Sequence, residues 1–249
     1  MNYKKLTSVQ YKQEWDEFSA AASKIPSTIK VMSIRGNHDS SNELSFNNSM
    51  YRRYLKGQSI QNEMITIEKP FGNYSLIAVD ATTEPGFKRP FNFVGYISDD
   101  SVAELKTFRE STLAHNQTVL YGHYTTSSKS MPYIRTFNLH CNLALYRATQ
   151  MRDLFSSMSI AYLCGHLHNG GGMIPRMQHM HTSGVAELEL ADWKKNRYFR
   201  VLSFDHDIFS FTDHKWSPDL LVVHITNPPK WHLTNPSKQV FPSFIISKL

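Results

Sequence analysis

The stretch Ile160-Ala-Tyr-Leu-Cys-Gly-His-Leu-His168 indicates the fold more strongly than any other part of the chain. Its five largely apolar residues predict a short buried strand, and the glycine that follows permits a tight departure from that strand. His166 and His168 are two positions apart, so an extended backbone places both imidazoles on one side. This pattern predicts metal-capable side chains at the carboxyl edge of a sheet.

Two earlier segments end in the same way. Ile29–Ile34 is a predicted strand followed by Arg35-Gly-Asn-His-Asp39, and Thr118-Val-Leu-Tyr121 runs directly into Gly122-His123. We call each of these turns, in which a glycine follows a strand and a metal-capable side chain follows the glycine, a corner. In layered α/β folds ligands collect at the carboxyl ends of the strands, so the three corners are expected to face one centre. Neutral imidazoles and an amide oxygen suit Mn, Fe or Zn better than Ca or Mg. The three corners together therefore predict a divalent-metal site.

The rest of the chain has the pattern of a mixed α/β domain. Apolar periodicity predicts helices at about 11–25, 44–55, 98–114 and 143–158. It predicts further strands at about 64–68, 74–81, 186–190, 199–204, 208–212 and 220–226. Residues 227–249 contain four prolines and show no clear period. We therefore expect one domain over 1–226, followed by a Pro-rich tail or the start of a further β segment over 227–249.

Composition limits the classes of protein to consider. The 249 residues include only 2 cysteines, which cannot form a disulfide framework. No apolar stretch approaches the roughly 18 residues that span a bilayer. The net charge of +6 arises mostly from scattered basic pairs, which are typical of a solvated surface rather than of nucleic-acid binding. We expect no nucleic-acid partner.

The three corners resemble the third, fourth and fifth motifs of the calcineurin-like metallophosphoesterases. Longer strings resemble the phosphoesterase domain of the transmembrane protein 62 family. These strings are Pro70-Phe-Gly-Asn-Tyr-Ser-Leu-Ile-Ala-Val-Asp-Ala-Thr82, Lys88-Arg-Pro-Phe-Asn-Phe93, Ile160-Ala-Tyr-Leu-Cys-Gly-His-Leu-His168, Glu187-Leu-Glu-Leu-Ala-Asp-Trp-Lys194, Phe204-Asp-His-Asp207 and Ile225-Thr-Asn-Pro228. The resemblance implies a four-layer α/β/β/α sandwich with a two-metal site between its sheets. It also implies hydrolysis of phosphate monoesters or diesters.

The same resemblance assigns roles to individual residues. Asn37, His123 and His166 would bind the second metal, and His168 would bind the first. His38 would be catalytic, facing the phosphate ester and either assisting its leaving group or holding its phosphate. In such enzymes the two metals activate water and stabilise charge on the phosphoryl oxygens. Full-length members of the family are associated with membranes through helices that this chain does not contain, and the chain's own compartment stays open.

Two motifs of the superfamily are missing. No glycine precedes an aspartate and no aspartate has a histidine two positions later, so neither Gly-Asp-x-x-Asp nor Asp-x-His occurs. The four predicted ligands carry no formal charge, whereas two divalent ions bring four positive charges. We therefore expect a domain that is incomplete at its N-terminus, with at most one weakly bound ion and no appreciable turnover. Asp39 and Asp80 are the nearest substitutes, but each is expected to cap a turn instead.

Two readings of this pattern remain open. One is a phosphoesterase domain shortened by a fragmentary gene model or by splicing. The other is a non-catalytic pseudo-phosphoesterase that serves as an interaction or membrane-tethered module. Outside the motifs, His179 and His181 are expected on an exposed strand or loop. Arg200 is expected to belong to a basic patch with residues 193–197, and Cys164 is expected to be a small buried apolar residue.

Overall fold

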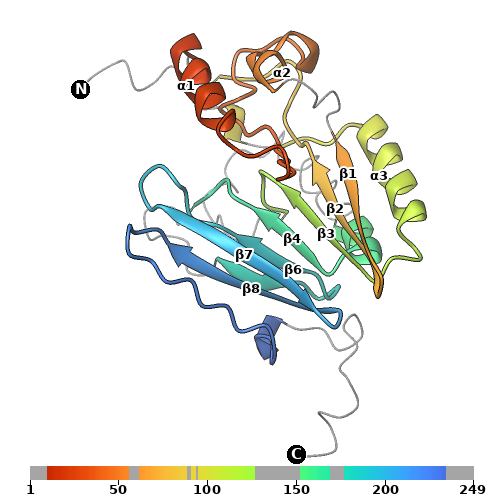
Figure 1. Ribbon diagram of the computed structural model, residues 1–249. Helices are drawn as coiled ribbons and strands as arrows, with labels where there is room; N and C mark the ends of the chain where they lie inside the picture. Colours follow the sequence, from red (N-terminus) through yellow and green to blue (C-terminus); the bar gives the residue numbers. More distant parts are fainter. Residues whose placement is uncertain are drawn as a thin grey trace, which may run out of the picture.

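A computed structural model describes residues 10–55, 62–88, 91–93, 95–126, 152–168 and 177–233, and its centre is a six-stranded sheet (Figure 1). The strand order is β1-β2-β3-β4-β6-β5, in which β2, β3, β4 and β6 run parallel and the edge strands β1 and β5 are antiparallel to their neighbours. The strands are β1 Glu63–Lys69, β2 Gly72–Val79, β3 Gln117–Gly122, β4 Ala161–Cys164, β5 Gln178–Met180 and β6 Ala186–Glu189. The expected mixed α/β class is confirmed.

Helices cover one face of this sheet. Helix α3 (Asp99–Ser111) begins at Ser98, whose side chain accepts a hydrogen bond from the backbone N–H of Ser101. A second helical segment covers residues 152–158, and the part of its predicted length before 152 lies outside the described residues. Leu105 of α3 packs in one core cluster with Leu120 of β3 and Phe155. Both helices are therefore held by burial of apolar side chains against the sheet.

Leu105 provides a direct test of this helix–sheet packing. Its side chain is fully buried, so we expect Leu105→Ala to lower the free energy of unfolding by about 2–5 kcal/mol. Leu113 lies just beyond the same helix and is 68% exposed, so Leu113→Ala is expected to change stability by less than about 0.5 kcal/mol. Urea unfolding of the two variants measures both values, and equal losses would contradict the packing described.

A two-stranded sheet packs on the other face. Strands β7 (Tyr198–Asp205) and β8 (Ile208–Lys215) form an antiparallel hairpin that closes where Asp205 pairs with Ile208. Phe209 and Phe211 of β8 share a core cluster with Val119, Ala161 and Leu188 of the large sheet. The described residues thus form a helical layer, a six-stranded sheet and a two-stranded sheet, and the second helical layer of the expected sandwich stays a prediction.

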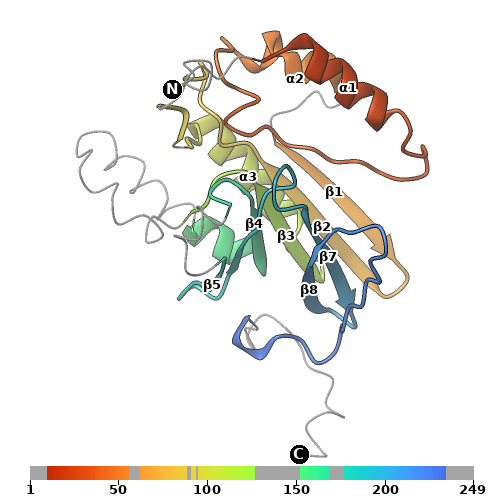
Figure 2. The same ribbon diagram turned by 90° about the vertical axis from the view of Figure 1, so that its left-hand side faces the viewer.

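The N-terminal region forms a small helical unit. It consists of α1 (Lys12–Ala22), a 3-10 turn η2 (Phe46–Asn48) and α2 (Met50–Tyr54). Trp15 stacks on Tyr54 with ring centroids 5.8 Å apart, and no residue of α1 is buried. Figures 1 and 2 both place α1 and α2 beyond the end of the sheet at which β2 finishes. The predicted helices in this region are confirmed, but they pack on each other and not in the main core.

Two predicted strands are wrong. Neither Ile29–Ile34 nor Leu220–Thr226 is a strand, and several of their apolar side chains are exposed, among them Ile29 at 56% and Leu221 at 81%. A strand needs a neighbour to pair its backbone N–H and C=O groups, and no described strand lies in register with either segment. Two further 3-10 turns are η3 (Phe91–Phe93) and η7 (Trp231–Leu233). Within the described ranges, no helix is both long enough and apolar enough to cross a membrane.

Candidate metal centre

The three glycine corners meet at the carboxyl ends of β3 and β4. The backbone N–H of Gly165 donates to the carbonyl oxygen of His123 at 3.1 Å, which ties the turn after β4 to the end of β3. Gly36 is buried against the His123 ring, and a Cβ atom at that position would lie 3.0 Å from two of the ring atoms. Any other residue at position 36 would therefore press its Cβ against the His123 ring and require that ring to shift.

The corners bring three donor atoms of predicted ligands together. Nε2 of His123 lies 3.0 Å from Oδ1 of Asn37 and 2.9 Å from Nδ1 of His166. A hydrogen bond to the backbone holds the turn at Asn37 in place, because Nδ2 of the buried Asn92 donates to the Asn37 carbonyl oxygen at 3.1 Å. The structure thus places one amide oxygen and two ring nitrogens in direct contact, on side chains that are 86 and 43 residues apart along the chain.

The backbone determines which nitrogen of His166 carries the proton. Nε2 of His166 lies 2.9 Å from the carbonyl oxygen of Phe93, which can only accept, so Nε2 must donate. In the neutral ring Nδ1 is then left with a lone pair directed at His123. This arrangement, in which the second ring nitrogen is held by a carbonyl, is typical of histidines that bind metals.

Burial keeps both rings neutral, as metal binding requires. Burial, together with the nearby imidazoles of His166 and His168, lowers the pKa of His123 to about 3. Burial also lowers the pKa of His166 to about 4, although the hydrogen bond to Phe93 opposes this shift. Both imidazoles are therefore uncharged over the whole neutral range, and each has one ring nitrogen that carries a lone pair.

The donor set fits one divalent ion. For metal–nitrogen bonds of about 2.1 Å, two donors at right angles in an octahedral site lie about 3.0 Å apart, and the two spacings from Nε2 of His123 are of that size. One amide oxygen and two imidazoles suit Mn, Fe or Zn. The set does not fit a two-metal centre, because no carboxylate joins it. Among the residues that the structure describes, no group of three His, Cys, Asp or Glu side chains is placed to hold a metal.

The remaining two predicted site residues lie at the rim. The side chain of His168 is 45% exposed, and its Nδ1 is 3.6 Å from Oδ2 of Asp192. His38 is exposed beside Asn37, and its charge contributes to the lowered pKa of His123. The structure therefore joins Asn37, His123 and His166 directly, and it places His168 and His38 near them on the open side.

The two candidate carboxylates are held elsewhere. Oδ2 of Asp39 accepts from the backbone N–H of Gly36 at 2.8 Å, so this side chain caps the turn that it follows. Asp80 accepts from the backbone and the hydroxyl of Thr82 at 2.8 and 2.6 Å, and it pairs with Nε of Arg35 at 2.7 Å. Their expected role as turn caps is what the structure shows.

Glu189 is a site residue that the sequence reasoning missed. Its Oε1 accepts from the backbone N–H groups of Leu167 and His168 at 2.7 and 2.9 Å, and its Oε2 accepts from the thiol of Cys164 at 3.0 Å. Burial raises the pKa of Glu189 to about 7, and its hydrogen bonds oppose that rise. The only signal in the sequence was the string 187–194, which carried the family resemblance without indicating a role. Cys164 is buried as expected, but it has a polar partner.

Two other expectations, those for His181 and Arg200, are wrong. His181 is buried, not exposed, because its Nε2 lies 3.0 Å from Oε2 of the buried Glu187, whereas His179 is exposed on β5 as expected. Arg200 does not belong to an open basic patch, because its side chain is 5% exposed and paired with Asp213. In both cases the side chain is buried beside a carboxylate partner, 6 residues away for His181 and 13 residues away for Arg200.

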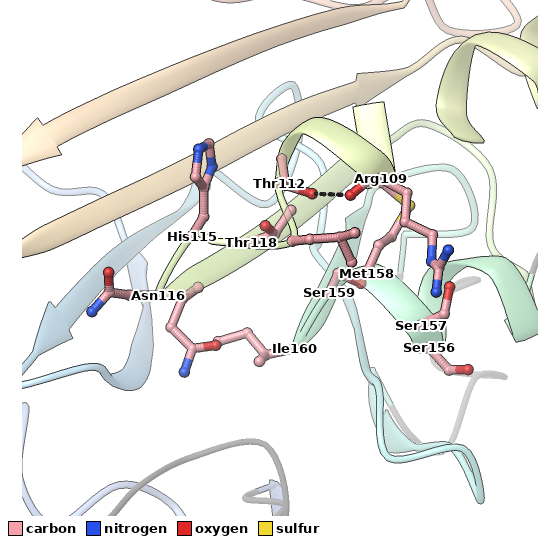
Figure 3. Close-up of a pocket in the computed structure, with 12 residues that line it drawn as sticks. Arg109, Thr112, His115, Asn116, Thr118, Ser156, Ser157, Met158, Ser159 and Ile160 are labelled. Carbon is pink, nitrogen blue, oxygen red and sulfur yellow. Dashed lines mark hydrogen bonds between the residues drawn. The ribbon is translucent and has the colours of Figure 1, made fainter. Parts of the chain in front are cut away.

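A cavity of about 250 Å³ lies at the opposite ends of β3 and β4 from the histidine cluster (Figure 3). It is lined by residues at the start of β3, by residues just before β3 and β4, and by the last turns of the two helices. Two hydroxyls in its lining form hydrogen bonds with backbone carbonyl groups near the ends of those helices. Thr112 donates to the carbonyl oxygen of Arg109 at 3.1 Å, and Ser157 donates to that of Leu154 at 2.7 Å. This cavity is not part of the candidate metal centre.

The described residues form a mixed α/β domain with a candidate metal site at the carboxyl ends of β3 and β4. The chain is 38% identical over 230 residues to transmembrane protein 62 of Mus musculus, and the alignment covers 90% of this chain. It is 24% identical over 247 residues to an Arabidopsis thaliana protein named as a candidate metallophosphoesterase, with 78% of this chain covered. The resemblance inferred from the motifs is confirmed.

The relatives are longer than this chain. The chain spans about a third of their length, at 33% of transmembrane protein 62 and 31% of the Arabidopsis protein. No protein-family model matches the chain.

Proposed function

We propose that this chain is a metal-binding domain of the phosphoesterase type whose cluster of Asn37, His123 and His166 holds one divalent ion. The observation that carries the proposal is the position of Nε2 of His123, which lies 3.0 Å from Oδ1 of Asn37 and 2.9 Å from Nδ1 of His166. Similarity to a candidate metallophosphoesterase supports the use of a divalent metal. His168 would lie at the edge of this site, next to a second ion in a longer protein that supplied the carboxylates.

The substrate class is a phosphate monoester or diester. A bound divalent ion would supply Lewis-acid stabilisation of charge on the phosphoryl oxygens. The chain's own contribution is to orient that ion through three neutral donors and to present His38, whose exposed imidazole can carry a proton to the leaving-group oxygen. Because the cluster contains no carboxylate, the chain on its own is expected to bind the ion weakly and to show no appreciable turnover.

A second candidate function is a non-catalytic pseudo-phosphoesterase that acts as an interaction module. The lack of carboxylates in the cluster favours this alternative, because Asp39 and Asp80 already have structural partners. The two functions predict different results when the aspartates of the missing motifs are supplied. A phosphoesterase domain should then hydrolyse a phosphate ester, whereas a non-catalytic module should not.

The experiment compares two chains in one assay. The first is the 249-residue chain, and the second is the same chain joined to an N-terminal segment bearing Asp-x-His and Gly-Asp-x-x-Asp. Hydrolysis of a chromogenic phosphodiester is measured with Mn²⁺ or Zn²⁺. We expect turnover only from the joined chain and its loss on His38→Ala. A joined chain that binds two ions but hydrolyses neither a monoester nor a diester would establish the interaction module instead.

A further inference from the structure

The carboxylate of Glu189 lies directly behind the loop that carries His166 and His168. It accepts hydrogen bonds from two successive backbone N–H groups, those of Leu167 and His168. The Glu189 side chain comes from the end of β6, next to β4, and the residue is only 5% exposed. A buried carboxylate that receives two backbone N–H groups fixes the path of the backbone at those residues.

The loop needs such support because its backbone is unusual. His168 has φ of +54°, a left-handed conformation that non-glycine residues rarely adopt. Such a conformation costs of the order of 1 kcal/mol or more and persists only where surrounding contacts hold it. The hydrogen bond from the His168 N–H to Glu189 is one such contact, so the carboxylate helps to set the direction of the His168 side chain.

Glu189 is itself anchored by the second sheet. Arg200 of β7 donates to the backbone carbonyl oxygens of Leu188 at 2.8 Å and Glu189 at 3.0 Å. The same guanidinium pairs with Asp213 of β8 through two hydrogen bonds, at 2.5 and 2.8 Å, and lies over the Phe211 ring. A continuous set of contacts therefore runs from the β7–β8 hairpin through Glu189 to the ligand loop.

We propose that Glu189 is the positioning residue of the candidate metal centre, holding His166 and His168 in place through the backbone of their loop. The inference rests on the proposed function, because it takes His166 to be a ligand of the single bound ion and His168 to lie at the edge of the same site. Glu189 does not contact the metal and is not a ligand. Its effect on metal affinity arises because its hydrogen bonds make the loop that carries His166 and His168 more rigid.

Glu187 provides a matched control on the same strand. It is also 5% exposed and also accepts a backbone N–H, that of Thr126 at 3.1 Å, but its partners are Thr126 and His181 and not the loop 165–168. Replacing either glutamate removes a buried carboxylate from β6. Only Glu189 contacts the ligand loop, so a difference between the two variants isolates positioning from general loss of stability.

The test uses the full 249-residue chain and four variants: Glu189→Leu, Glu189→Gln, Glu187→Leu and Glu187→Gln. Calorimetric titration with Zn²⁺ gives affinity, and amide hydrogen exchange gives protection at Leu167 and His168. We expect Glu189→Leu to weaken Zn²⁺ binding by about 10–100-fold and Glu189→Gln, which keeps an acceptor oxygen, to recover most of it. Both Glu187 variants should bind Zn²⁺ within about twofold of the parent chain.

The two proposals can fail separately. If the parent chain binds no Zn²⁺, the proposed function fails, and hydrogen exchange decides the inference. In that case at least about tenfold faster exchange at Leu167 and His168 in Glu189→Leu than in Glu187→Leu supports positioning by Glu189. Equal exchange in the two leucine variants, or unchanged Zn²⁺ affinity in a folded Glu189→Leu, overturns it.

Discussion

Replacing Arg35 by methionine is expected to lower the free energy of unfolding by about 3–5 kcal/mol. The Arg35 side chain is 1% exposed, and its guanidinium pairs with Asp80 at 2.7 Å and Glu84 at 3.0 Å. It also lies over the Phe46 ring at 4.7 Å. Methionine fills a similar volume but leaves Asp80, 3% exposed at its side chain, with no counter-ion. Burial of an unpaired carboxylate is one of the costliest changes that a single substitution can make.

The loss should depend on pH. Burial raises the pKa of Asp80 even in the presence of Arg35, which opposes the rise, so removing Arg35 must raise that pKa further. A folded-state pKa above the unfolded value means that stability is greatest at low pH and falls as pH rises through the folded pKa. Arg35→Met should therefore be less destabilised at pH 5 than at pH 8.

Two controls separate the ion pair from the ring contact. Arg52 is exposed and lies over the same Phe46 ring at 5.8 Å, so Arg52→Met should cost less than about 1 kcal/mol. The double variant Arg35→Met, Asp80→Asn should recover about 1–3 kcal/mol of the loss. Urea unfolding at both pH values measures these quantities. Equal destabilisation at pH 5 and pH 8, with no recovery in the double variant, would refute the ion-pair explanation.

Replacing His123 by alanine is expected to weaken binding of Mn²⁺ or Zn²⁺ by at least about 100-fold. His123 is the central member of the cluster, because its Nε2 contacts both Asn37 and His166. In His123→Ala the ion keeps only Asn37 and His166 as ligands from the cluster, and no donor atom of the cluster lies between them. His179 is an exposed histidine on β5, and His179→Ala should leave affinity within about twofold. Equilibrium dialysis measures both, and thermal unfolding checks that each variant is folded.

The sequence predicted the elements that carry strong local signals. The strands before Gly122 and Gly165 and the hairpin of β7 and β8 were expected from short apolar or alternating runs. Asn37, His123 and His166 could be grouped in advance because each follows a glycine at or near a predicted strand end. The grouping depended on the motif pattern, and the structure shows that these side chains are in contact.

The remaining features depend on partners far away in the chain. Apolar residues at 29–34 and 220–226 could not be told from strands, because pairing requires a neighbour that the local pattern does not specify. The role of Glu189 comes from its contact with a loop 21–22 residues earlier in the chain. Phe93 contributes through its backbone carbonyl oxygen, which every residue has, so its identity in the sequence does not indicate this role. Arg35 looked like part of a motif corner, but its burial comes from carboxylates 45 and 49 residues away.

The central claim is that the chain offers one metal site made of neutral donors. The most direct measurement is the metal content of the purified 249-residue chain after equilibration with excess Mn²⁺ or Zn²⁺ and removal of free ions, determined by elemental analysis. We expect no more than one ion per chain, and we expect His123→Ala to lose it. Two tightly held ions per chain would contradict the central claim, because the described residues bring no carboxylate into the cluster to balance the second charge.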